Sequence, residues 1–303
     1  MKSNFNKILL VCCLLVSVTG HTQIDINRCS EEVKEDFSPR VFLFLNQKLL
    51  ANASNANTLY LSHKQDLKIF SFPGNGIVTA AVDEKEEKIA VSYYNNRINV
   101  YDAKTRDTIH QINAAKKSNV MVFKGNQLLY GLDTGEVKSY NFNTKKESSI
   151  ATHNDIVRGV SVLNDALVLS ISSDGVFQAN QTNKPVQQKT FEKQLTSIAI
   201  SPNQQRIALG TFKGSVYILD RNFNLIQELW PHTSVITKLK FKNNEELISS
   251  AFDKKLVNTN IATGGYTSMY TSKDYIMTFD VSAKRLIYSD RSGNVRYYNF
   301  NCQ

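Results

Sequence analysis

The 303-residue sequence predicts an all-β protein built from a repeat. Six short segments share the pattern aliphatic-x-x-x-Asp/Asn, and their last residues lie 39 or 40 positions apart. These segments are 98–102, 137–141, 176–180, 216–220, 256–260 and 295–299. A degenerate seventh copy, 59–63, ends 39 residues before the first of them. Repeats of about 40 residues with four short strands each are typical of β-propeller blades.

The strands of one repeat are visible between residues 195 and 232. Runs of β-branched and aliphatic residues at 195–200, 206–211, 216–219 and 225–229 are separated by turns rich in Gly, Asn, Asp and Pro. Such runs indicate antiparallel strands. We therefore predict a seven-bladed β-propeller, and a linear β-solenoid is the alternative.

The two ends of the chain are expected to meet in the last blade. The predicted propeller covers residues 41–303, but only three strands of the seventh repeat precede Gln303. The N-terminal segment, residues 21–40, belongs to no other blade. It is therefore expected to supply the closing strand.

Residues 1–20 have the order of a secretory signal peptide. Lys2 and Lys7 precede an apolar stretch at 8–18, and the small residues Thr19 and Gly20 follow. The apolar stretch is shorter than the roughly 17–25 residues of a membrane-spanning helix. The sequence predicts a secreted or periplasmic protein, with an uncleaved N-terminal anchor as the alternative.

Cleavage of this signal would leave two cysteines, Cys29 and Cys302, one near each end. In an oxidising compartment a disulfide is the default for such a pair. An outer strand that begins near Cys29 would bring the two residues together at the closing blade. A strand at 24–27 would instead make the bridge awkward.

The formal net charge of +9 favours acidic partners, such as an acidic protein or polymer. Solubility alone is the alternative explanation. Lys and Arg are spread along the chain without a basic run, so nucleic acid is not an expected partner. Two triplets, 52–54 and 180–182, match the acceptor pattern for N-glycosylation.

The repeat resembles the WD40-type propellers and, more loosely, bacterial propellers with Tyr-Val-rich blades. The resemblance rests on the period, the Asp/Asn-ended strand and two histidines that lead into blades, His153 and His232. The Trp-Asp dipeptide of that family is present only as Tyr101-Asp102 and Leu219-Asp220. The resemblance implies a bracing network of His153, Ser172 and Asp174 in one blade. It implies another of His232, Ser250 and Asp253.

The sequence offers no catalytic, cofactor-binding or metal-binding constellation. The histidines are scattered, and no Gly-x-Ser-x-Gly, phosphate-binding loop or dinucleotide motif is present. We assign no catalytic, cofactor or metal residues on this basis and expect a monomeric, non-enzymatic protein. The alternative is an exported hydrolase, lactonase-like or glycan-cleaving, with carboxylates or histidines converging in the central channel.

Basic and aromatic residues gather at the turns expected on one face of the propeller. Tyr93 and Tyr94 lie in one such turn, and further basic and aromatic positions follow in later blades. Aromatic anchors beside Lys and Arg are typical of binding surfaces. The predicted partner-binding face consists of Arg97, Phe212, Lys213, Phe252, Lys254 and Arg291. A merely solvated face is the alternative.

Overall fold

The computed structural model describes residues 76–301 with their side chains, apart from 165–166 and 182–183. Between residues 30 and 71 it describes five strands by their backbone. The predicted signal peptide, Cys29 and Cys302 lie outside the described residues. Over the described ranges every regular element is a strand, and none of these ranges holds a helix with the length and hydropathy to cross a membrane.

In the described part, antiparallel strands form four-stranded sheets whose order follows the chain outward from the ring axis. The first two sheets with described side chains are β6 (Ile77–Val82), β7 (Lys88–Tyr93), β8 (Arg97–Asp102), β9 (Thr108–Asn113), and β10 (Ser118–Lys124), β11 (Gln127–Leu132), β12 (Glu136–Asn141), β13 (Lys146–Thr152). The next two are β14 (Val157–Leu163), β15 (Leu167–Ser172), β16 (Val176–Asn180), β17 (Gln187–Thr190), and β18 (Leu195–Ile200), β19 (Arg206–Thr211), β20 (Val216–Asp220), β21 (Leu225–Leu229). A fifth is β22 (Ile236–Phe241), β23 (Glu246–Ala251), β24 (Lys255–Asn260), β25 (Tyr266–Thr271).

The remaining two sheets involve the N-terminal strands. Strand β1 (Ser30–Lys34) pairs antiparallel with β28 (Asn294–Asn299), which continues into β27 (Arg285–Asp290) and β26 (Ile276–Val281). The other sheet is β2 (Pro39–Leu45), β3 (Lys48–Ala53), β4 (Thr58–His63) and β5 (Asp66–Ser71). Strand β2 contacts both β26 and β6.

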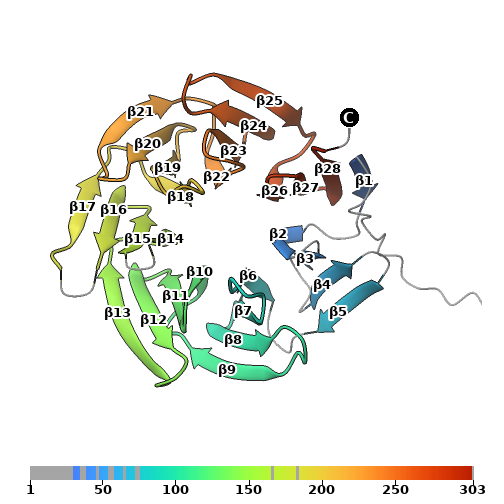
Figure 1. Cartoon of the computed structure of the whole chain (residues 1–303), viewed down its shortest axis with the longest axis vertical. Coiled ribbons are helices and arrows are strands. Elements are labelled where there is room, and N and C mark those ends of the chain that lie inside the picture. The colour runs from blue at the N-terminus through green and yellow to red at the C-terminus, as the bar shows by residue number, and fades with distance from the viewer. Residues whose placement is uncertain are drawn as a thin grey trace, which may run out of the picture.

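The sheets stand side by side around a central axis, so the molecule is a β-propeller (Figure 1). The predicted all-β propeller is confirmed. Counting the sheets of the described strands gives seven, of which six have described side chains.

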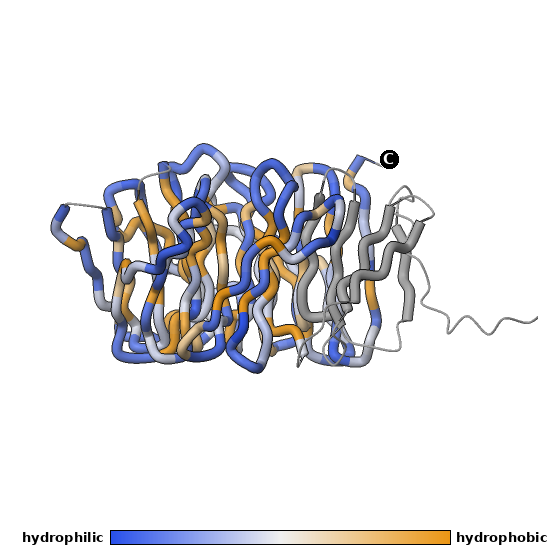
Figure 2. The backbone as a smooth tube through the Cα atoms, turned by 90° about the horizontal axis from the view of Figure 1, so that it is seen from below, coloured by the Kyte–Doolittle hydropathy of each residue, from blue (hydrophilic) through white to orange (hydrophobic). Residues whose placement is uncertain are grey.

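Burial follows the position of each strand in its blade. The second strands β7, β11, β15, β19, β23 and β27 are buried at every residue but the first, because both faces of each blade pack against neighbouring blades. The outer strands are mostly exposed or half-buried. Hydrophobic residues therefore fill the strands, and hydrophilic residues line the turns of both faces (Figure 2). This explains why the second strands are rich in apolar residues, and why their polar residues, such as Ser92, Ser170 and Ser249, are buried as well.

The Asp/Asn that ends the repeat pattern caps the turn after the third strand. The side-chain oxygen of Asp102 accepts hydrogen bonds from the backbone amides of Lys104 and Thr105 at 2.8 and 2.7 Å. Asn141, Asp220, Asn260 and Asn299 accept equivalent bonds. This local turn chemistry is the usual role of Asx side chains.

Asn180 ends another of the six pattern segments but does not cap its turn. Strand pairing places Gln181, one residue later, at the capping position, and Asn180 is a buried strand residue opposite Val168. Its Nδ2 atom is inaccessible, so the glycosylation triplet at 180–182 is unsuited to modification of the folded protein.

Candidate functional site

The turns between second and third strands are anchored by one backbone hydrogen bond that recurs in every blade with described side chains. The residue directly after the second strand, called here the first turn residue, donates its N–H to a carbonyl in the loop that leads into the same blade. The bonds are Tyr94 to Gly76, Asp133 to Lys117, Ser173 to Ile156, Phe212 to Gln194, Phe252 to Val235 and Arg291 to Tyr275, at 2.9–3.1 Å. These turns and loops together form the turn face.

The bond fixes the backbone of each first turn residue, while the exposure of the side chain differs from blade to blade and Ser173 is buried. Phe212, Phe252 and Arg291, all predicted site residues, hold this position in three consecutive blades. Phe212 and Phe252 are 50% and 46% exposed. The three residues lie on the turn face because the same backbone bond holds each of them at the same place in its blade.

Three of the predicted residues meet around Tyr275, which leads into the blade of β26–β28. The Phe252 ring lies 5.5 Å from the Tyr275 ring. Lys254 Nζ and the Arg291 guanidinium lie 5.6 and 5.5 Å from the centroid of the same ring, within cation–π range. The result is an aromatic pair flanked by two cations.

Acidic and backbone groups hold these cations in place. Arg291 Nε lies 3.5 Å from the Asp274 carboxylate, and Lys254 Nζ donates to the carbonyl of Lys273 at 3.0 Å. The backbone amide of Tyr275 donates to Asp274, and together with Arg291 it keeps the pKa of this carboxyl below its usual value. The cluster is therefore positioned before any partner arrives.

The other predicted residues lie further round the turn face. Lys213 follows Phe212 in the adjacent blade, and its amide is held by Thr211 Oγ1 at 3.3 Å. Arg97 begins β8, in a blade separated from that of β26–β28 by the β2–β5 sheet (Figure 1). The cluster at Tyr275 is thus made without Arg97. Tyr93, expected in the same surface, is buried.

Sequence reasoning missed Tyr275 and Trp230. Trp230 directly follows the outer strand β21, so its position in the repeat suggested the blade edge. The ring is half-exposed at the turn-face end of that strand, with Lys193 Nζ 4.9 Å from its centroid. Lys193 is held by Glu228 at 2.8 Å, an ion pair that raises the pKa of the lysine. Tyr275 holds the loop position whose carbonyl accepts the recurring backbone bond, and this place in the repeat could have identified it.

His232 braces the blade that follows it. Its Nδ1 lies 3.0 Å from both carboxylate oxygens of Asp253, and its Nε2 lies 2.8 Å from Ser249 Oγ. Burial tends to raise the pKa of Asp253, but the His232 contact and the amides of Thr233 and Lys255 outweigh it, so the pKa is lowered. The implied serine, Ser250, is wrong, because its side chain points to the other face of β23 and bonds Thr237.

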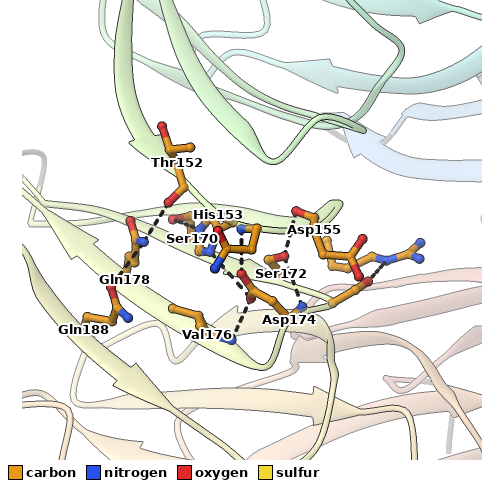
Figure 3. A network of polar contacts seen from close by, with 12 residues as sticks. Thr152, His153, Asp155, Ser170, Ser172, Asp174, Val176, Gln178 and Gln188 are labelled. Carbon is orange, nitrogen blue, oxygen red and sulfur yellow. Dashed lines mark hydrogen bonds and ion pairs between the residues drawn. The ribbon is translucent and has the colours of Figure 1, made fainter.

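His153 forms a looser version of the network (Figure 3). Its Nε2 lies 2.8 Å from Ser170 Oγ, while its Nδ1 is 3.8 Å from Asp174. Asp174 is held by the amides of Asn154 and Val176 at 2.9 Å. Ser172 donates instead to the carbonyl of Asp155, so the implied role of Ser172 is also wrong. Both histidines therefore link the loop that leads into a blade to the second strand of that blade.

Among the innermost strands whose side chains are described, β22 and β26 carry a charged cluster. Lys240 on β22 forms an ion pair with the buried Asp280 on β26, and Lys238 lies 5.6 Å from the Phe279 centroid. Burial lowers the pKa of Lys238 to about 8; Lys240 adds to this effect and Asp280 opposes it. Asp280 is the one carboxylate on the innermost strands with described side chains. Among the described residues, no group of three His, Cys, Asp or Glu has metal-binding geometry.

Several curated proteins share part of this sequence, although no protein-family model matches it. WD repeat and FYVE domain-containing protein 2 of Caenorhabditis elegans is 26% identical over 193 residues, 58% of this chain and 46% of that protein. The vacuolar protein sorting-associated protein 41 homolog of Caenorhabditis briggsae is 38% identical over 76 residues, which are 23% of this chain and 8% of that protein. The 26S proteasome regulatory subunit RPN14 of Saccharomyces cerevisiae is 50% identical over 54 residues, which are 17% of this chain and 13% of that protein. The chain matches less than half the length of each relative.

A solved structure extends the likeness to the whole ring. The WD40 β-propeller domain of Doa1 superposes with a TM-score of 0.78, covering 90% of this chain and 96% of that domain. The two sequences are 14% identical. At that level the similarity establishes the fold.

Proposed function

Since this chain is a WD40-like β-propeller, we propose that it acts as an exported, non-enzymatic interaction scaffold. Its partner is an acidic protein or another acidic polymer, bound at the turn face. The observation that carries the proposal is the cluster of Phe252, Tyr275, Lys254 and Arg291. The net charge of +9, which becomes 9 − 2 = +7 once Lys2 and Lys7 leave with the signal peptide, favours an acidic partner.

The cluster has the two components that a binding surface needs. Phe252 and Tyr275 offer 46% and 38% exposed rings as anchors, and Phe212 adds a third in the next blade. Buried aromatic anchors contribute most of the binding free energy, while rim charges mainly set association rate and salt dependence. Lys213, Lys254 and Arg291 supply those charges.

We test this face with fluorescently labelled poly-L-glutamate as the acidic probe. Wild-type binding should weaken as salt rises, because dissolved ions screen the attraction between the cations of the turn face and the carboxylates of the probe. The double variant Lys213→Glu, Lys254→Glu should bind at least tenfold more weakly than wild type. Phe252→Ala made alone should also weaken binding, with little change in its salt dependence.

A control with the same change of charge uses Lys146→Glu with Lys284→Glu. Lys146 begins the outer strand β13, and Lys284 lies in a first-to-second-strand turn on the opposite face. This variant should bind like wild type. Equal loss in both double variants would show that only net charge matters, and unchanged binding of the turn-face variants would contradict the proposed face.

Export is supported by the charged, apolar and small-residue order of residues 1–20. N-terminal sequencing of the protein from the medium or periplasm should find a start after Gly20 or Gln23. An intact Met1 on a protein confined to the cytoplasm would contradict export.

We also propose that the ring has seven blades and is closed by the N-terminal strand. The pairing of β1 with β28 and the contacts of β2 with β26 and β6 support this arrangement. Removal of residues 21–38, which takes away β1 and spares β2, should then leave the last blade with three strands and lower the unfolding temperature. An unchanged unfolding temperature would contradict the closure.

A further inference from the structure

A polar groove of about 920 Å³ lies between the blade of β10–β13 and the blade of β14–β17. One wall comes from Leu129, Ser139, Ser148 and Ile150, and the other from Val168, Asn180 and neighbouring residues. The groove also meets the turn at Lys124–Gln127, which joins the first and second strands. It therefore opens toward the face opposite the turn face, and its volume is in the range of ligand-binding sites.

The groove exists because a bulky pair is missing. Strand pairing puts Asn180 opposite Val168 in the third and second strands. The equivalent pairs in the other blades are Tyr101 and Ile89, Tyr140 and Leu128, Leu219 and Ile207, Thr259 and Leu247, and Tyr298 and Leu286. Asn180 thus stands where three of these five blades have Tyr, and Val168 is smaller than its equivalent in each of the five.

The facing wall is reduced in the same way. Where the blade of β6–β9 meets the blade of β10–β13, His110 packs against Tyr140 with ring centroids 5.9 Å apart. The residue equivalent to His110 in the next blade is Ser148, which pairs with Ser139. The Ser139 and Ser148 hydroxyls bond each other at 2.8 Å. An aromatic contact in one interface is therefore a polar slot in the next.

Asn180 is 7% exposed and lines this slot, and its Nδ2 has no hydrogen-bond partner among the described residues. A buried amide without a partner costs free energy, so its presence calls for a physical explanation. A carbonyl oxygen of a bound molecule would satisfy it. Leu129, Ile150 and Val168 would meanwhile contact an apolar group in the slot.

The rest of the lining indicates the class of ligand. Carboxamides predominate around the rim, and these groups donate and accept hydrogen bonds as peptide groups do. They are Asn126, Gln127, Asn141, Asn143 and Gln181. Lys124 and Lys184 are partly balanced by Glu84, and none of the described residues that line the groove is an aromatic that could stack on a sugar.

We propose that this groove binds an extended, uncharged peptide segment of a partner, which inserts one aromatic side chain between the two blades. The inserted ring occupies the place that Tyr140 fills at the preceding interface, and the buried Asn180 amide turns toward the groove so that a peptide carbonyl accepts from its Nδ2. The site is separate from the turn face, so a scaffold of this kind engages two partners, or two parts of one partner, at once.

The test uses a phage-displayed library of random dodecapeptides panned against the whole protein. Selected peptides should share an aromatic residue, and fluorescence polarisation should show at least a tenfold weaker affinity for Asn180→Tyr, whose side chain fills the slot. Thermal unfolding should show that this variant folds with an equal or higher midpoint. Asn180→Leu, which removes only the polar group, should give an intermediate loss.

Phe252→Ala on the turn face is the matched control and should bind the same peptides like wild type. Equal affinity of wild type and Asn180→Tyr would overturn the proposal, as would a failure to select any peptide. Peptides that depend on Phe252 rather than on Asn180 would also overturn it, while supporting the turn face.

Discussion

His153 and His232 occupy equivalent places but have different electrostatic surroundings. The carboxylate lies 3.0 Å from His232 Nδ1 and 3.8 Å from His153 Nδ1, and the latter atom has no hydrogen-bond partner among the described residues. Burial lowers the pKa of His153, and Asp174 only partly opposes this effect. The neutral form of His153 is therefore the form that the fold favours.

Lower pH should consequently destabilise the protein through His153. With a folded pKa below the unfolded value of 6.5, the unfolded chain takes up the proton first as pH falls through that value. Urea denaturation at pH 7.5 and 5.5 should show a smaller free energy of unfolding at pH 5.5. His153→Gln should show a shallower dependence, and an unchanged dependence would contradict this assignment.

Two lysines on β22 should respond in opposite ways to removal of their charge. Lys238→Met should raise stability at pH 7, because burial lowers the pKa of this lysine to about 8 and its charged form is disfavoured. The advantage over wild type should shrink between pH 7 and 9, since the folded protein gives up this proton before the unfolded chain does. Urea titrations across that range measure it.

The control is Lys240→Met, which removes the ion-pair partner of the buried Asp280. Breaking a buried pair typically costs about 3–5 kcal/mol, with less expected here because Lys240 itself is partly exposed. Equal effects of the two substitutions would contradict the different roles assigned to these lysines.

At the scale of elements, the turn between second and third strands depends on glycine where the backbone passes close to a neighbouring loop. Gly135 has φ +89°, and a Cβ there would lie 2.2 Å from the His153 carbonyl oxygen. Gly125, in a turn on the opposite face, has φ +53° and open space around it. A substitution at Gly125 meets backbone strain alone, whereas one at Gly135 meets backbone strain and steric overlap.

Gly135→Ala should therefore cost clearly more stability than Gly125→Ala. A left-handed backbone costs an alanine about 1–2 kcal/mol, and at Gly135 the overlap with a carbonyl adds to it. Chemical denaturation of both variants measures the difference. Similar losses at the two sites would show that the loop at His153 moves aside freely.

The sequence predicted the strands of the repeat well, because each blade has the same order of buried runs and turn residues. The predicted strand at 206–211 is Arg206–Thr211 in the structure, and 225–229 is Leu225–Leu229. The pattern failed at Asn180, where an Asn one position early imitates the turn cap. The sequence pattern does not distinguish a buried Asn from a capping Asn, because the pairing of the second and third strands decides which residue reaches the turn.

At the scale of the whole molecule, the candidate site was only partly predictable. The repeat placed Phe212, Phe252 and Arg291 at one turn position, which is a property of local sequence. Tyr275 and the slot at Asn180 depend on contacts between blades. Those contacts are set by which residues face each other across an interface, and a single repeat does not record them.

Ring closure gives a prediction for Cys29 and Cys302, which lie outside the described residues. Strand β1 begins at Ser30, which pairs with Tyr298 near the end of β28. We expect a disulfide between the two cysteines, with Cα atoms within roughly 4.4–6.8 Å. Cys302→Ser should lower stability by about 2–4 kcal/mol in the oxidised protein. Alkylation of both thiols in the native, unreduced protein would contradict the bridge.

The recurring backbone bond at the turn face has an evolutionary consequence. Because the turn is held by a main-chain N–H and a main-chain carbonyl, this bond does not depend on which side chain stands at that position, although Ser173 and Asp133 add side-chain contacts of their own. The six residues found there are chemically diverse: Tyr94, Asp133, Ser173, Phe212, Phe252 and Arg291. Selection can therefore exchange these residues singly and change what the protein recognises without rebuilding its frame. The same ring of positions is a natural starting library for engineering new binding specificities.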